Sequence, residues 1–173
     1  GSERLRVDSS GKLLYGTTST FDTESSAPVQ VNGGGSGSIA CTGNSTSGQT
    51  RISFYNPNGR VGYISTNGSA TAYNTSSDYR LKENATSISD GITRLKTLKP
   101  YRFNFKTDTN TTVDGFFAHE VTAVPEAITG EKDGAEMQGI DQSKLVPLLT
   151  AALQEAIAKI ETLETKVTAL ESA

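Results

Sequence analysis

The feature that most constrains this 173-residue chain is an apolar repeat near its C-terminal end. The repeat predicts a helix over about residues 143–172, with one narrow apolar stripe that must pack on another helix. No second helix of matching length is predicted, so an oligomer is favoured over a bundle within one chain. β-Branched residues and Leu mix at both seam positions, so the seam alone does not fix the number of chains. Its members, spaced alternately by three and four residues, are Val146, Leu149, Leu153, Ala156, Ile160, Leu163, Val167 and Leu170.

A change in composition near residue 76 divides the chain. Residues 1–76 hold 12 of the 17 glycines, 24 Ser or Thr and 9 charged residues, whereas residues 77–173 hold 26 charged residues. Apolar residues make up 34% of the chain, against roughly 45–50% in typical globular domains. The predicted fold class is α+β, with a β-rich intertwined stalk fragment in residues 1–76. A small α+β domain follows in residues 77–173 and ends in the coiled-coil helix.

Short alternating runs between turn signals predict strands in the first half. These runs are too poor in large apolar residues to build a core of their own, so we expect them to share an interior with partner chains. The Gly-rich segment 33–38 lacks the lysine and the strand-loop-helix context of a phosphate-binding loop, and we interpret it as a flexible or tight-turn segment. The predicted strands are residues 5–7, 12–15, 51–55 and 61–64, and the predicted turns are residues 8–11, 56–59 and 67–68.

The second half predicts a compact mixture of helix and strand. A short helix is expected from Asp90 to Leu98, capped by Ser87 or Ser89 and ended by Pro100. Alternating aromatic residues then predict a half-buried strand over residues 101–105. A polar turn across residues 108–112 leads into a second strand over residues 113–118. Another helix is expected to begin at residues 119–121 and to stop at Pro125.

Charge and residue counts exclude several classes of function. The net charge of -3 and the sequence pI of about 5.2 argue against nucleic-acid binding. No apolar run approaches the roughly 18 residues of a membrane span, and no secretory signal is read. Gly1-Ser2 resembles the remnant of an expression tag, so we expect the natural protein to be longer. Cys41 and His119 are single residues of their kind, so no disulfide, metal or other cofactor is expected.

One cluster of candidate catalytic residues falls at the composition break. A serine hydroxyl is a weak nucleophile until a base takes its proton, and lysine can be that base when burial or nearby cations favour its neutral form. Ser77 and Lys82 offer such a pair, although their spacing alone is an everyday coincidence. His119 is interpreted as a packed or hydrogen-bonding residue, and Glu120 as an acid that favours a helix start. No carboxylate pair for glycoside cleavage stands out.

Residues 77–84 (SDYRLKEN) resemble the S-D-x-R-x-K-x-N opening of the intramolecular chaperone auto-processing domain, the S74 peptidase family. Such domains end many phage tail fibres, tailspikes and neck appendages, and they also occur in the animal myelin regulatory factor family. His119 departs from the family, which usually has glutamine there. Residues 3–11 and 14–18 resemble phage-fibre sequence less specifically. Further matching segments, in the family's order, are residues 98–103 (LKPYRF), 115–121 (GFFAHEV), 125–128 (PEAI), 140–141 (ID) and 145–149 (LVPLL).

The resemblance implies a homotrimeric chaperone that folds a fibre stalk and then cuts itself free, acting as a single-turnover serine endopeptidase. The scissile bond would join Ser76 to Ser77, with Ser77 as nucleophile and Lys82 as general base. Attack within one chain and attack between chains both stay open. Supporting residues that would shape the site or polarise the carbonyl are expected at Asp78, Arg80, Asn84, His119 and Glu120.

The resemblance also implies partners and a location. The partners would be the other two chains, the N-terminal stalk and, for the mature fibre, a host surface receptor. The mature stalk is expected in the virion tail fibre, and the chaperone is expected to be released in the host cytoplasm. Three alternatives stay open: a non-cleaving trimer clamp, a receptor- or glycan-binding fibre tip in residues 1–76, and the membrane-tethered transcription-factor branch. The Gly/Ser/Thr-rich first half argues against the last. No P-loop is readable, so no nucleotide site is predicted.

Overall fold

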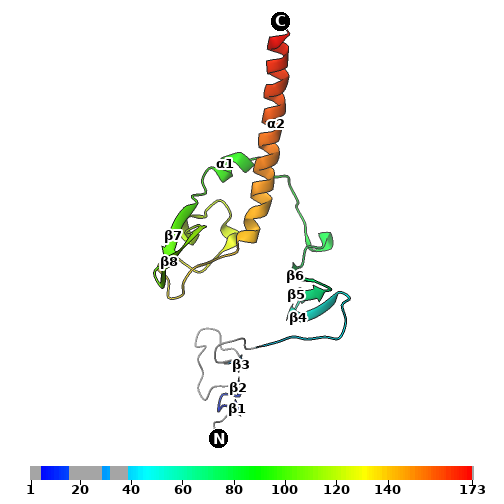
Figure 1. Ribbon diagram of the computed structural model, residues 1–173, viewed down its shortest axis with the longest axis vertical. Coiled ribbons are helices and arrows are strands. Elements are labelled where there is room, and N and C mark those ends of the chain that lie inside the picture. The colour runs from blue at the N-terminus through cyan, green and yellow to red at the C-terminus, as the bar shows by residue number, and fades with distance from the viewer. Residues whose placement is uncertain (1–4, 16–28, 32–38, 173) are drawn as a thin grey trace. The chain divides into compact units, whose positions relative to one another are not determined.

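The computed structural model describes residues 5–15, 29–31 and 39–172. The Gly-rich segment 33–38 lies outside the described residues. Contacts divide the chain into two compact units, Gly1–Glu83 and Asn84–Ala173. The predicted mixed α+β class is confirmed, because small sheets are combined with one long C-terminal helix (Figure 1).

The first unit opens with a small three-stranded sheet. Its first two strands run antiparallel around the predicted turn, where the Asp8 carboxylate accepts hydrogen bonds from the backbone N–H groups of Ser10 and Lys12. A third strand, which the sequence did not predict, joins the second in parallel. Leu14 is buried, whereas Leu5 and its neighbours along β1 are exposed. The strands are β1 (Leu5–Val7), β2 (Leu13–Tyr15) and β3 (Val29–Val31).

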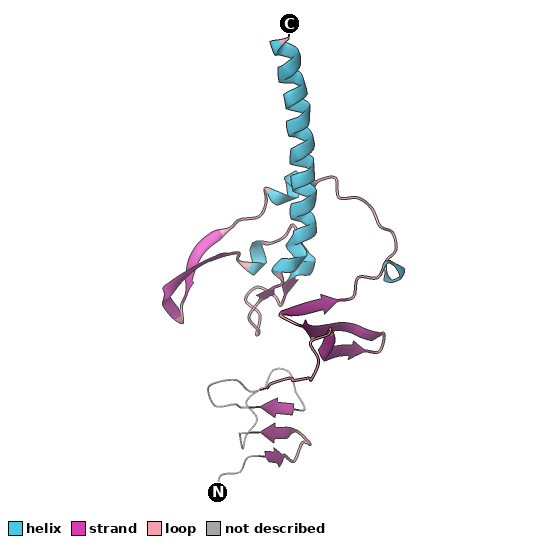
Figure 2. Ribbon diagram, turned by 45° about the vertical axis from the view of Figure 1, so that its right-hand side comes forward, coloured by secondary structure: helices cyan, strands magenta, loops and turns pink. Residues whose placement is uncertain are grey.

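A second, antiparallel sheet follows in the order β4-β5-β6 (Figure 2). The sequence predicted the first two strands but not β6, which consists of small and polar residues around one tyrosine. Ile52, Ile64 and Tyr73 form one row across the three strands, and Ile52 and Tyr73 are exposed. The sheet therefore presents apolar side chains that the described residues do not cover. Its strands are β4 (Gln49–Asn56), β5 (Gly59–Asn67) and β6 (Ala70–Thr75).

The second unit has a small core where short turns meet the start of the long helix. Its buried side chains are Val121, Val124, Ala127, Leu145 and Leu148, with Leu98, Phe116, Ala123, Ile128 and Ile140 packed against them. The antiparallel pairing of β9 with β10 places Ile128 opposite Ile140, and both side chains pack against this core. The elements are η2 (Ala118–Glu120), η3 (Pro125–Ala127), β9 (Ile128–Thr129), β10 (Gly139–Ile140), η4 (Gln142–Leu145) and helix α2 (Val146–Glu171).

The aromatic strand is the first arm of a hairpin, β7 (Tyr101–Phe105) with β8 (Asp108–Gly115). The prediction of a polar turn over residues 108–112 was wrong, since these residues belong to β8 and the turn lies at residues 106–107. A register shift at Asn104/Phe105 lets β8 pair from its first residue. The Asn104 amide donates to the Thr112 hydroxyl across the hairpin. Cross-strand polar pairs and β-branched threonines therefore stabilise a strand here.

The predicted helix from residue 119 to Pro125 was also wrong. A short 3₁₀ turn forms at Ala118–Glu120 in place of the helix, and Pro125 begins a second 3₁₀ turn instead of ending a helix. Val121 and Val124 are both almost fully buried against the core. Burial of two nearby valines in a tight loop has overridden the local helix signal, as tertiary packing commonly does.

Helix α1 is shorter than predicted, Gly91–Leu95, and its N-cap is Asp90 instead of Ser87 or Ser89. The Asp90 side chain makes no capping hydrogen bond. Instead Glu155 of α2 accepts from the backbone N–H groups of Gly91 and Ile92, at 2.5 and 3.1 Å. A carboxylate from another helix thus satisfies donors that a local cap satisfies elsewhere.

Gly91 fixes how closely the two helices approach. A Cβ atom there would lie 2.5 Å from the backbone nitrogen of Ala152 and 2.8 Å from the carbonyl carbon of Ala151. The neighbouring atoms are helix backbone, so they cannot move aside. Gly91, Ala151 and Ala152 are all buried, and the small side chains allow backbone-to-backbone packing.

Helix α2 leaves most of its apolar seam uncovered. Apart from Ala156, every residue of the predicted seam is 45–77% exposed. In both views the C-terminal half of α2 extends past the other elements of its unit (Figures 1 and 2). The helix begins at Val146 rather than 143, because the preceding residues form η4, whose cap Asp141 accepts from the Ser143 N–H and hydroxyl. Among the described residues, no helix combines the length and apolarity needed to cross a bilayer.

Removing the charge of Glu155 should destabilise the second unit in a pH-dependent way. The backbone N–H groups of Ile92 and Gly91 lower the pKa of Glu155. A carboxyl group whose pKa is lowered by folding stabilises the fold above its unfolded pKa of about 4.3, and this stabilisation is lost as pH falls through the lowered value. Glu155→Gln should therefore lower the Tm at pH 7, and the difference from wild type should shrink in acid.

The matched control is Glu164→Gln, on the part of α2 beyond α1. Thermal unfolding followed by circular dichroism at pH 7 and pH 3 measures both variants. Equal Tm values for Glu155→Gln and wild type at pH 7 would contradict the capping role.

Candidate active site

The candidate nucleophile and base meet in one short turn. The Lys82 ammonium nitrogen Nζ lies 2.8 Å from the Ser77 hydroxyl oxygen Oγ, within hydrogen-bonding distance. The 3₁₀ turn η1 (Tyr79–Leu81) separates them and brings Lys82 back toward Ser77. The backbone N–H of Lys82 donates to the Tyr79 carbonyl at 3.0 Å, which fixes the end of the turn. The spacing of five residues thus becomes a contact because the chain turns once between them.

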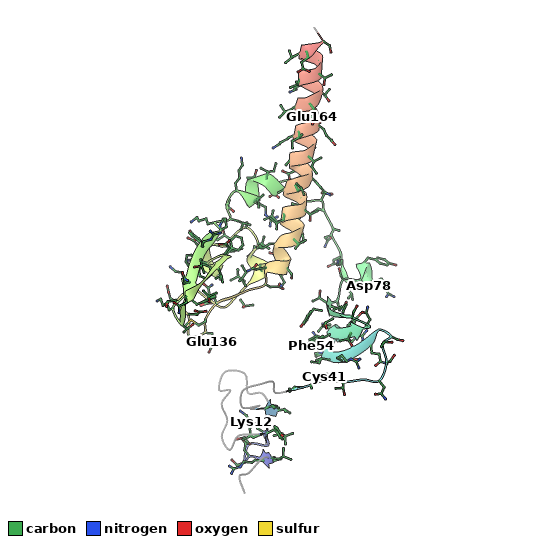
Figure 3. All side chains as sticks on the ribbon, in the orientation of Figure 1. Lys12, Cys41, Phe54, Asp78, Glu136 and Glu164 are labelled. Carbon is green, nitrogen blue, oxygen red and sulfur yellow. The ribbon has the colours of Figure 1, made fainter. Side chains whose placement is uncertain are left out.

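Asp78 builds the turn. As its N-cap, Asp78 accepts a hydrogen bond from the Arg80 backbone N–H at 2.9 Å. The same carboxylate binds the Arg80 guanidinium through Nε at 3.0 Å and Nη2 at 2.7 Å. The Arg80 side chain and then its backbone lower the pKa of Asp78. Asp78, labelled in Figure 3, therefore supports the site by holding the turn and by binding Arg80.

Ser76 is held by the sheet that precedes the turn. Its backbone N–H donates to the Val61 carbonyl at 3.1 Å. Its hydroxyl lies 3.1 Å from the same carbonyl oxygen and 3.3 Å from that of Arg60. The bond between Ser76 and Ser77 thus joins the end of a β-ladder to the turn that carries Lys82. This arrangement was not predicted, because β6 was not recognised from the sequence. The turn at Asn67-Gly68 is the signal that sets the register of β6 on β5.

The site is open to solvent in the described chain. Every residue from Ser77 to Asp90 is exposed, including Tyr79 at 81% and Leu81 at 72%. Two large side chains are thus exposed in the turn that separates the candidate nucleophile from its base. Lysine acts as a base only when neutral, and removal from water favours the neutral form.

The remaining predicted residues belong to the second unit. Asn84 is its first residue and has a left-handed backbone, with φ of 53°. This conformation is one that asparagine adopts more readily than most residues. Asn84 thus takes this left-handed conformation two residues after Lys82.

His119 and Glu120 lie together in η2. The exposed His119 ring stacks on Phe117 at 6.1 Å between centroids. Glu120 pairs with Lys99 at 3.2 Å, and the Tyr101 hydroxyl, then Lys99, lowers the pKa of Glu120. The same interaction raises the pKa of Tyr101. Glu120 thereby links η2 to the base of the aromatic hairpin, a role that sequence analysis did not foresee.

Comparison with known families identifies this part of the chain. Residues 77–129 match the family model described as the chaperone of endosialidase, Peptidase_S74. The match begins at Ser77 and takes in the turn, helix α1, the hairpin and the two 3₁₀ turns of the core. No curated protein and no solved structure matches the chain.

The family match supports an S74-type chaperone domain, and the structure gives this part of the chain a mixed α+β fold. Residues 77–129 carry an S74-family chaperone domain, as the resemblance implied. The domain follows a β-rich segment and is continued by the long helix α2.

Proposed function

We propose that the chain is a C-terminal intramolecular chaperone that trimerises, folds a phage tail-fibre or tailspike stalk, and then releases itself by autoproteolysis between Ser76 and Ser77. The observation that carries the proposal is the 2.8 Å contact between Lys82 Nζ and Ser77 Oγ, at the position where the chaperone-family match begins. A serine held by a lysine is an arrangement that activates the hydroxyl as a nucleophile.

The chemistry needs Lys82 in its neutral form. Its amine takes the proton of the Ser77 hydroxyl as Oγ bonds to the carbonyl carbon of Ser76. The peptide C–N bond then breaks, the proton passes from Lys82 to the departing Ser77 amine, and the Ser76 acyl group is left as an ester on the attacking serine. Water hydrolyses this ester, giving a Ser76 carboxylate and a free hydroxyl. Each chain reacts once.

Assembly would supply the desolvation that the base requires. In the single chain the dyad is exposed, and so are Tyr79 and Leu81 next to it. Covering these side chains with neighbouring chains would exclude water and favour neutral Lys82. Cutting would then follow trimerisation instead of preceding it. Once the stalk is registered, release of the chaperone makes the assembly kinetically hard to reverse.

The trimer itself is proposed from the exposed seam of α2. The seam residue Leu149 also lines an open apolar groove of about 480 Å³, together with Leu95, Leu98, Pro100, Phe116, Gln142 and Leu145. Apolar surface therefore continues from the helix onto the body of the second unit. A coiled coil of this kind would bring three stalks together and raise their local concentration.

Replacing either member of the dyad should stop self-cleavage. The measurement is denaturing electrophoresis with intact mass on freshly expressed wild type, Ser77→Ala and Lys82→Ala. Wild type should give two fragments that meet between Ser76 and Ser77, while both variants stay intact. Arg80→Ala should weaken the turn without removing either dyad group, so slower but detectable cleavage is expected. Intact wild-type protein would contradict autoproteolysis and favour a non-cleaving clamp.

A polar residue in the exposed seam should dissociate the trimer. Leu163→Asn in a Ser77→Ala background should weaken association by on the order of a hundredfold or more, since one apolar contact is lost in each chain. Glu164→Asn, one position off the seam, is the matched control and should leave association close to wild type. Sedimentation equilibrium gives the masses. A monomeric parent protein, or equal association of all three proteins, would contradict the coiled coil.

A further inference from the structure

The carbonyl group that the proposed reaction attacks belongs to a residue fixed by the β4–β6 sheet. β6 pairs with β5 in a regular register that includes Asn67↔Ala70 and Gly62↔Thr75. The hydrogen bond from the Ser76 N–H to the Val61 carbonyl extends this ladder by one further pair. The residue on the acyl side of the bond is thus the last paired residue of a strand.

The Ser76 hydroxyl adds a second attachment to the same strand. Its oxygen lies within hydrogen-bonding distance of two successive carbonyl oxygens, those of Arg60 and Val61 at the start of β5. A hydroxyl has one proton, so it shares that proton between the two acceptors. Arg60 is itself positioned, with its guanidinium 4.4 Å from the centre of the Tyr63 ring. These contacts restrict rotation about the backbone next to the carbonyl group.

The nucleophile is held by a different element. Ser77 Oγ contacts Lys82, whose backbone closes the 3₁₀ turn onto Tyr79. The electrophile is therefore held by the sheet and the nucleophile by the turn, with the scissile bond between them. Reactions of this type depend steeply on alignment, and a displacement of about 1 Å can cost roughly a hundredfold in rate.

We propose that Ser76 is a positioning residue, and that the folded β5–β6 ladder presents the scissile carbonyl to Ser77. The inference rests on the proposed function and adds a control to it: a chain is cut only after its own β4–β6 sheet has formed. The folding of the stalk segment would then act directly on the cleavage site, through three contacts between Ser76 and the carbonyl oxygens of Arg60 and Val61.

A matched pair of substitutions isolates the hydroxyl. Ser76→Thr keeps the hydroxyl group. Ser76→Val introduces a side chain of nearly the same shape as threonine, but without the hydroxyl group. Pulse-chase cell-free synthesis of the full chain gives the first-order rate of cleavage. Ser76→Val should be about five- to tenfold slower than wild type, as expected for one neutral hydrogen bond. Ser76→Thr should cleave within about twofold of the wild-type rate. Because threonine and valine have nearly the same volume, such a difference between the two variants would come from the hydroxyl group.

A second pair tests the ladder away from the site. A Cβ atom on Gly62 would lie 2.9 Å from the Asn74 carbonyl oxygen, so Gly62→Ala must displace β5 from β6. Gly68→Ala lies in the turn between the same strands, where a Cβ atom meets nothing within 4 Å. Gly62→Ala should slow cleavage by on the order of tenfold or more, and Gly68→Ala should cleave like wild type.

The outcomes separate this inference from the proposed function. Cleavage of Ser76→Val and Gly62→Ala at the wild-type rate would overturn the role of the sheet and leave the dyad in place. An uncut wild-type chain would overturn both. Slow Ser76→Val and Gly62→Ala, with rapid Ser76→Thr and Gly68→Ala, would establish that the folded sheet positions the scissile bond.

Discussion

The apolar seam of α2 is the constraint on which the proposed assembly depends. Only the first turns of this 26-residue helix pack against described residues, where Leu148, Ala151 and Ala152 are buried. From Leu153 onward the seam is exposed apart from the half-buried Ala156. Burial of apolar surface stabilises a protein by roughly 25 cal/mol per Å², and this seam gains none of it until another helix covers it. In the proposed trimer, association of chains would bury this seam and so stabilise the helix.

The candidate site, like the seam, is exposed to water in the single chain. Ser77 and Lys82 are already in contact, so no large rearrangement is needed to form the pair. What the single chain lacks is cover, because the turn and its apolar side chains face water. A neutral base, a fixed carbonyl and an aligned hydroxyl would each come from a different source: assembly, the β4–β6 sheet and the 3₁₀ turn. Such a division would tie one irreversible cut to several folding events.

The sequence was informative wherever a pattern was local and repeated. The seam predicted α2 to within a few residues, and the motif at residues 77–84 selected the two side chains that meet. Prediction from the sequence failed where contacts between distant residues determine the local structure. Glu155 caps α1 across more than sixty residues. The burial of two valines favours 3₁₀ turns over the predicted helix. The contact between Ser76 and β5 was missed for the same reason, since it depends on the register of a strand with no apolar alternation.

The most direct test asks whether cleavage belongs to the assembled form. Chains synthesised in a cell-free system are cross-linked at successive times, separated into single chains and trimers, and analysed for the new Ser77 N-terminus. If cleavage requires the trimer, cut chains are expected only among trimers, with a delay that lengthens when the protein is diluted. Single chains that are cut at the same rate as trimers, whatever the dilution, would contradict it.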